Sequence, residues 1–205
     1  MDKAFDFQAL DDDARAFMSN PEPIRLKKAI TQHIEQAFYA LANEIESKFP
    51  NEALKIDAAW SVRTAKISKG ENYQDMPYVV LDYPFLMHQK DLLLFRTMFW
   101  WGHYFSLNLL IKGESFHHPV QALIQQLQKS PEPDVYILTS DNFWQNDISG
   151  LDFSSCNAKA AQYSWEQYRH IRMVHQVDFD SIDSLQVKCL AFTQKMLSAM
   201  QLLKQ

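Results

Sequence analysis

Residues 105–112 alternate between apolar and polar side chains, which is typical of a half-buried β-strand. In the preceding segment, residues 92–101, both the odd-numbered and the even-numbered positions are apolar except at Arg96 and Thr97. This pattern indicates a central strand that is covered on both faces. Gly102 separates the two segments. The pattern therefore predicts a long antiparallel hairpin around this glycine, and the rest of the chain is interpreted relative to it.

The length of the turn decides which faces of the two strands coincide. A two-residue turn would place Arg96 on the face of Phe105 and Leu107, and an unpaired guanidinium is costly inside a core. We predict a three-residue loop, residues 102–104, which pairs Phe99 with Leu107 and leaves Arg96 on the opposite face. A slip of one residue would exchange the two faces, whereas a five-residue loop would preserve them.

The face that carries Arg96 combines bulky apolar and polar residues. Its members are Leu92, Leu94, Arg96, Met98, Trp100, Ser106, Asn108 and Lys112. Two interpretations are open. In the first, a helix or a partner subunit covers this mixed face and Arg96 pairs with a carboxylate; in the second, the face forms a ligand-binding groove. Asp82, in an otherwise apolar strand, is the preferred internal partner for Arg96 or for Arg63.

Helical periodicity appears near both ends of the chain and once in its middle. An N-cap and a proline at residues 20–21 open a helix that is expected to reach about Lys48, with an apolar stripe that includes Ile34, Phe38 and Leu41. A second helix is expected around residues 120–127, where apolar residues follow the i, i+3, i+4, i+7 pattern. The third begins at Asp180 or Ser181 and carries an apolar stripe to Leu203. This stripe is expected to pack on the sheet, with a coiled-coil seam as the alternative.

We predict an α+β fold in a single globular domain over residues 1–205, with residues 1–20 as an N-terminal extension or short helix. The sheet is mostly antiparallel, with about four to six strands. The long N- and C-terminal helices pack on its Phe95 and Phe99 face. The expected strands are residues 58–68, 78–83, 92–101, 105–112, 134–140 and, with a weaker pattern, 168–177. Residues 69–77 are expected to form a loop and residues 141–163 an irregular segment that can lie as a lid over a groove.

The amino-acid composition argues against several classes of function but does not identify one. The chain is 47% hydrophobic and 22% charged, with a formal net charge of −5, and it has no basic run, which argues against nucleic-acid and membrane partners. Only four glycines are present, and none lies in a phosphate-binding loop motif, so we expect no nucleotide cofactor. Two cysteines are too few for a disulfide framework, and no signal peptide is recognisable, so a cytoplasmic location is expected.

Catalytic and metal-binding motifs are absent from the sequence. The seven histidines show no zinc-binding spacing, so no metal site is predicted. No Gly-X-Ser-X-Gly nucleophile motif occurs. Whether the protein is an enzyme therefore stays open.

The mixed face is the predicted working surface of a non-catalytic domain that binds a small molecule or another protein, with a small anionic or polar ligand expected at the guanidinium of Arg96. The alternatives are an enzyme with hydrolase-like acid–base chemistry, using His88 or His103 with Asp82, and a homodimer that buries this face or the final helix. The predicted binding residues are Arg63, Tyr73, Asp82, Arg96, Trp100, His103, Ser106 and Asn108.

Overall fold

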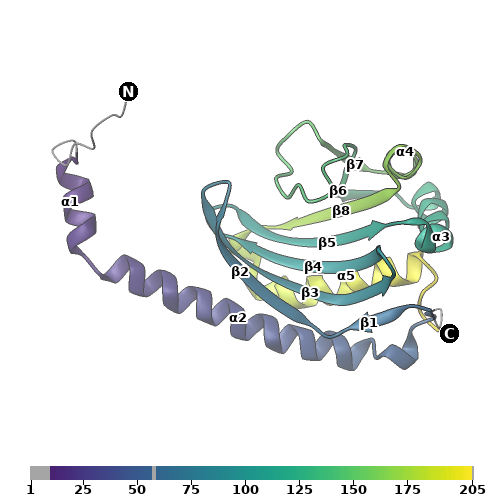
Figure 1. Cartoon of the computed structure of the whole chain (residues 1–205), viewed down its shortest axis with the longest axis horizontal. Helices are drawn as coiled ribbons and strands as arrows, with labels where there is room; N and C mark the ends of the chain where they lie inside the picture. Colours follow the sequence, from purple (N-terminus) through teal and green to yellow (C-terminus); the bar gives the residue numbers. More distant parts are fainter. Residues whose placement is uncertain (1–9, 57–58, 205) are drawn as a thin grey trace.

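The structure, a computed structural model, describes residues 10–56 and 59–204 and consists of an antiparallel sheet with helices around it (Figure 1). The first nine residues of the predicted N-terminal extension and residue 58 of the first predicted strand lie outside the described residues. The helices are α1 (Asp12–Ser19), α2 (Glu22–Lys48), α3 (His117–Lys129), α4 (Ala158–Tyr168) and α5 (Leu185–Ala199), with short 3-10 turns η2 (Asn51–Ala53), η3 (Glu114–Phe116) and η4 (Phe179–Ser184). In the described part of the chain, no helix has the length and hydrophobicity needed to cross a bilayer.

Within the described residues the sheet has eight strands, so the α+β class is confirmed while the predicted number of strands was too small. Their order is β1-β3-β4-β5-β8-β6-β7, and β2 also pairs with β3. Every pairing between these strands is antiparallel. The strands are β1 (Ser61–Arg63), β2 (Lys66–Tyr73), β3 (Met76–His88), β4 (Asp91–Trp100), β5 (Tyr104–Lys112), β6 (Glu132–Leu138), β7 (Phe153–Cys156) and β8 (His170–Val177).

The central hairpin confirms the predicted face assignment but not the exact register. Trp100 pairs with Tyr104 and Phe99 with Phe105, so the three-residue loop is residues 101–103. Gly102 occupies its middle with φ of 75°, a left-handed value that glycine adopts at low cost. Because the loop has the predicted length but begins one residue earlier, every pair shifts by two residues, and Arg96 pairs with Asn108 instead of Leu110. The shift keeps Arg96 on the face away from the phenylalanines.

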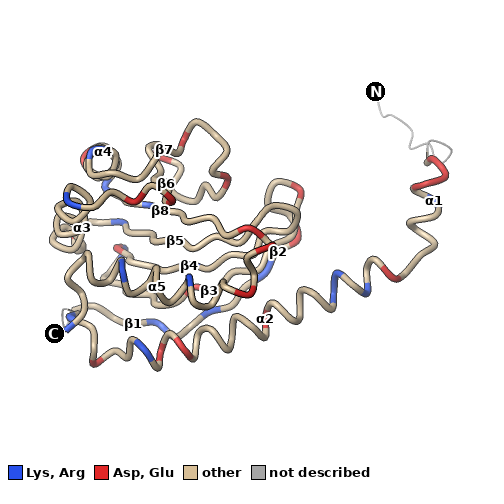
Figure 2. Tube along the Cα trace, turned by 180° about the vertical axis from the view of Figure 1, so that it is seen from behind, with Lys and Arg blue, Asp and Glu red and all other residues tan. Residues whose placement is uncertain are grey.

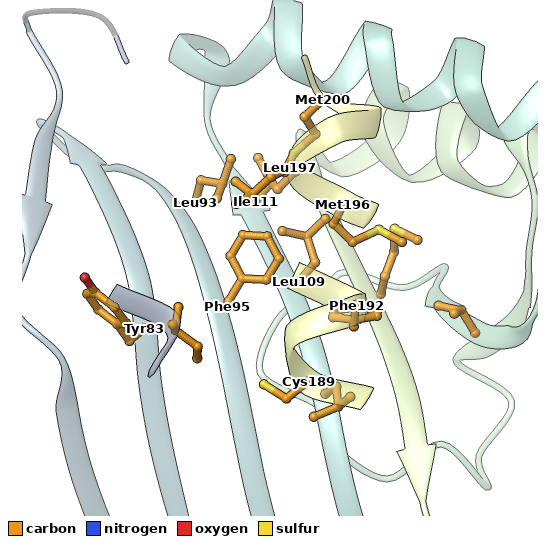
Figure 3. Packing of buried hydrophobic residues seen from close by; sticks show 14 of the residues in the cluster. Tyr83, Leu93, Phe95, Leu109, Ile111, Cys189, Phe192, Met196, Leu197 and Met200 are labelled. Atoms are coloured by element: carbon orange, nitrogen blue, oxygen red, sulfur yellow. The ribbon is translucent and has the colours of Figure 1, made fainter. Parts of the chain in front are cut away.

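The core lies between the phenylalanine face of the sheet and the helices α2 and α5, as predicted (Figure 1). In Figure 3, side chains of α5 that include Phe192, Met196 and Leu197 point at Phe95, Leu109 and Ile111 of the sheet. Full burial of such side chains stabilises a fold by roughly 1.5–3 kcal/mol each. Packing on this face of the sheet therefore stabilises the fold.

Helix α2 lies along the edge of the sheet formed by β2 and β3, and ion pairs add to its apolar contacts there. Lys69 Nζ of β2 is 2.7 Å from Glu35 Oε1 of α2, and Lys27 of α2 pairs with Glu71 of β2. Figure 2 shows that residues of both charges occur along α2 and β2. The first turns of α2 and the whole of α1 extend beyond the sheet (Figure 1). No residue of α1 is buried.

Several predicted boundaries were wrong for identifiable reasons. Strand β3 continues through Pro84, because a bulge between Asp82 and Phe85 removes the need for a proline N–H in the ladder. Residues 69–77 are not a free loop but complete the β2–β3 hairpin, with Gln74 and Asp75 at positive φ in its turn. Helix α4 begins inside the segment predicted to be irregular, and Asn157 caps it by accepting a hydrogen bond from the backbone N–H of Ala160.

Candidate functional site

The mixed face brings together most of the predicted binding residues, on the side of the sheet opposite to α5. Arg96 pairs with Asp82 on one neighbouring strand and with Asn108 on the other. The next strand, β8, adds Arg172 opposite Leu110. In the structure the mixed face also includes Asp82, Tyr104, Leu110 and Arg172.

Residues 139–152, the covering loop, pack on this face and bury it. The hydroxyl of Tyr104 donates to the carbonyl oxygen of Asn146 at 3.0 Å, and the hydroxyl of Tyr73 accepts from the backbone N–H of Asn146 at 2.9 Å. Phe143 of the loop packs with Leu94 and Leu110. This geometry matches the predicted lid, and it leaves Trp100 and Asn108 only 1% exposed.

Arg96 has its charge satisfied within the chain. Its Nε and Nη2 donate to the two carboxylate oxygens of Asp82 at 2.7 and 2.9 Å, which confirms the predicted pairing. The ring of Trp144, from the covering loop, lies 5.2 Å from the guanidinium carbon. A carboxylate and an indole therefore both contact this guanidinium, so its charge is compensated within the chain.

Arg172 is the residue of this face that sequence reasoning missed. Its side chain is fully buried, and its three hydrogen bonds go to neutral oxygens: the Phe143 carbonyl at 2.9 Å, Asn108 Oδ1 at 3.0 Å and Asn146 Oδ1. Burial, and then the nearby charge of Arg96, lower the pKa of Arg172 to about 9, so it remains charged at neutral pH. Since two of its acceptors belong to the covering loop, Arg172 ties that loop to the sheet.

Of the other predicted residues, one lies inside the face, one at the tip of the central hairpin and one away from the face. His103 stacks on Trp100 with ring centroids 3.5 Å apart, at the tip of the central hairpin. Ser106 accepts a hydrogen bond from Asn108 Nδ2 at 3.0 Å inside the face. Arg63 is exposed on β1, and β1 pairs with the part of β3 that follows the bulge. The role of these residues in binding stays a prediction.

A cavity of about 620 Å³ opens at the other end of β3, away from the mixed face. Its polar lining comes from Lys55, His88, Ser115, His118 and Gln201. Its walls are Trp60 and apolar side chains of α3 and of the segment after α5. We call it the end cavity. Its described lining residues are Lys55, Ile56, Ala59, Trp60, His88, Ser115, His118, Pro119, Ala122, Met200, Gln201 and Leu202.

Two turns of the chain position the polar groups of the end cavity. His88 ends β3 and pairs in the ladder with Asp91 at the start of β4. The carboxylate of Asp91 accepts a hydrogen bond from the backbone N–H of Ser115 at 2.9 Å, and the hydroxyl of Ser115 lies 2.8 Å from His88 Nδ1. The β3–β4 hairpin therefore fixes both partners of a serine–histidine contact.

The end cavity was not found from the sequence because its residues are dispersed along the chain. His88 was considered as an acid–base group together with Asp82. The two are six residues apart on β3, which corresponds to roughly 20 Å at the usual rise of about 3.3 Å per residue. The partner that the structure gives to His88 is Ser115. In the described part of the chain, no three His, Cys, Asp or Glu side chains gather as metal ligands would.

Comparisons with known proteins found a distant structural likeness and no family match. No protein-family model matches the chain, and no curated protein matches it. Among solved structures, a conserved hypothetical protein from Pyrococcus furiosus aligns over 88% of this chain and 99% of its own, with 9% sequence identity and a TM-score of 0.47. A likeness at this level says nothing about activity, so function is inferred from the geometry of the chain itself.

Proposed function

We propose that this protein is a small-molecule-binding domain and that the end cavity is its site for an organic anion. The observation that carries this proposal is the charge of the cavity lining. Lys55 supplies a positive charge, His88 and His118 supply imidazole nitrogens, and none of the described lining residues is a carboxylate. A site with this lining favours a ligand that brings negative charge.

The volume and the walls of the cavity indicate what kind of molecule carries the anionic group. A volume of about 620 Å³ is within the usual range for small-molecule sites. Trp60 supplies an aromatic wall, held in place by the ring of Phe116 with centroids 4.7 Å apart. An apolar or aromatic body with one anionic group fits this combination of surfaces.

The mixed face is a weaker candidate for the same role, because its own chain already occupies it. A ligand there has to displace the covering loop and compete with Asp82 for Arg96. The end cavity requires neither rearrangement. This difference is why the proposal places the ligand in the cavity.

A fluorescent aromatic anion, 8-anilinonaphthalene-1-sulfonate, tests the proposal by direct titration. We expect saturable binding to the folded protein, weakened at least tenfold by Lys55→Glu, because the substitution reverses one charge of the lining. Lys90→Glu is the matched control, since this exposed turn residue makes the same charge change outside the cavity lining. Equal weakening by both variants, or no saturable binding by the wild type, would overturn the proposal.

A further inference from the structure

Ser115 and His88 meet inside the end cavity in the arrangement of a nucleophile and its base. The Ser115 hydroxyl and His88 Nδ1 are 2.8 Å apart, and both side chains line the cavity. Among the hydrogen bonds of the described residues, no other joins a serine hydroxyl to a histidine ring. A hydroxyl that donates to an imidazole is the basic unit of serine nucleophilic catalysis.

The backbone around Ser115 holds the hydroxyl in place. Strand β5 ends at Lys112, Gly113 makes a turn with φ of 102°, and Ser115 follows in η3 directly before α3. A Cβ atom at position 113 would lie 2.0 Å from the carboxyl group of Asp91, so glycine is the residue that fits in this turn. Nucleophilic serines often occupy such strand-to-helix turns, although here His117 replaces the second glycine of the familiar motif.

We infer that Ser115 and His88 form a catalytic pair that hydrolyses small esters bearing an anionic group. This inference rests on the proposed function, because the cavity that binds the anion also holds the pair. The ammonium group of Lys55 and the imidazole of His118 line the same space and can stabilise the negative charge that develops on the carbonyl oxygen.

The reaction divides into two balanced steps. The Ser115 oxygen bonds to the ester carbonyl carbon while its proton passes to His88 Nδ1. The carbon–oxygen bond to the leaving alcohol then breaks, and His88 returns the proton to that alcohol. Water next attacks the acyl-serine with His88 as base, which releases the acid and regenerates the Ser115 hydroxyl. No oxidant, metal or further reactant is required.

Two substrates and one covalent probe test the inference on the full chain. A fluorophosphonate reagent reports an activated serine, because the serine oxygen displaces fluoride from phosphorus and leaves a stable adduct. We expect peptide mapping by mass spectrometry to find this adduct at Ser115. We also expect 4-nitrophenyl hydrogen glutarate, which is anionic, to be hydrolysed with a kcat/KM at least tenfold above that of neutral 4-nitrophenyl butyrate.

Three variants separate catalysis from folding. Ser115→Ala and His88→Gln should each lower kcat/KM by about 100-fold or more, because the nucleophile or the base is lost. Ser61→Ala is the matched control: its hydroxyl contacts the Met87 carbonyl at 3.4 Å, beside the same end of β3, and it is not among the residues that line the cavity. This variant should keep the wild-type rate, and circular dichroism should show equal folding of all three.

The outcomes distinguish this inference from the proposed function. If the wild type binds 8-anilinonaphthalene-1-sulfonate but shows neither an adduct at Ser115 nor hydrolysis above Ser115→Ala, the catalytic inference is overturned and the binding proposal stands. Absence of both binding and hydrolysis overturns both. Retained binding by Ser115→Ala with loss of hydrolysis supports both.

Discussion

The carboxylate of Asp82 accepts two hydrogen bonds from the guanidinium of Arg96, and both side chains are shielded from water, with 11% and 16% of their surfaces exposed. Removing one member of a shielded pair leaves the other charge without compensation. We expect Asp82→Asn to lower the free energy of unfolding by about 3 kcal/mol, measured by urea denaturation. The exposed pair Arg25–Glu22 is the control, and Glu22→Gln should cost no more than about 0.5 kcal/mol. Equal costs for the two variants would contradict this account.

The second prediction concerns the attachment of the covering loop. Asn146→Ala removes one loop acceptor of Arg172 while leaving the buried guanidinium its other oxygens. A hydrogen bond to a charged group contributes roughly 1.5–3 kcal/mol, so opening of the loop should become at least tenfold more frequent. Hydrogen exchange measured by mass spectrometry over residues 139–152 checks this. Ser149→Ala, a change at an exposed hydroxyl of the same loop, should leave the exchange rates unchanged.

The third prediction is a loss of stability on acidification, caused by His170. Burial, followed by the charges of Lys112 and Arg172, lowers the pKa of this histidine below its ordinary value of 6.5, against the opposing hydrogen bond to the Ser140 carbonyl. Below pH 6.5 the unfolded chain therefore binds a proton that the folded protein does not, and stability falls as the pH falls.

Melting temperatures between pH 5 and 7.5 measure this effect. His170→Gln should flatten the profile, because the neutral amide does not titrate in this range. His175→Gln changes a less buried histidine of the same strand and should leave the profile as steep as in the wild type. A wild-type profile with no slope below pH 6.5 would refute the assignment.

The fourth prediction is that both thiols are inert in the folded protein. Burial raises the pKa of Cys156 to about 12 and also raises that of Cys189. At pH 8 only about one Cys156 side chain in ten thousand is then a thiolate, the form that reacts. Ellman's reagent should therefore find both cysteines only after denaturation, whereas an exposed cysteine introduced by Ser149→Cys should react at once. Rapid modification of a native cysteine would be inconsistent with this packing.

The central hairpin was predictable because hydrophobic burial fixes the side of each strand residue. Arg96 was placed correctly, opposite the phenylalanines, since an unpaired charge in that core would be costly. The exact position of the turn was not, because a shift of the loop by one residue keeps every side chain on its face. The alternation of apolar and polar residues therefore constrains which face of the sheet a side chain occupies more tightly than it constrains which residues pair across the two strands.

The covering loop and the end cavity depend on contacts between distant parts of the chain. Residues 141–163 show little periodicity because the loop within them is held by Tyr73, Tyr104 and Arg172 rather than by its own pattern. The sequence did contain a signal for Arg172. In the weakly alternating segment 168–177, this charged residue lies between the apolar residues Ile171 and Met173. Ser115 and His88 are 27 positions apart, and no local pattern links them.

The projection of α1 and the first turns of α2 beyond the sheet changes how this molecule behaves in solution (Figure 1). Helix α2 alone has 27 residues, or about 40 Å of length. A compact chain of 205 residues has a radius of gyration of only about 17 Å. A gel-filtration column calibrated with spherical standards will therefore overestimate the mass of the 24.0 kDa monomer. Light scattering, which measures mass without regard to shape, is the measurement that decides whether the predicted homodimer exists.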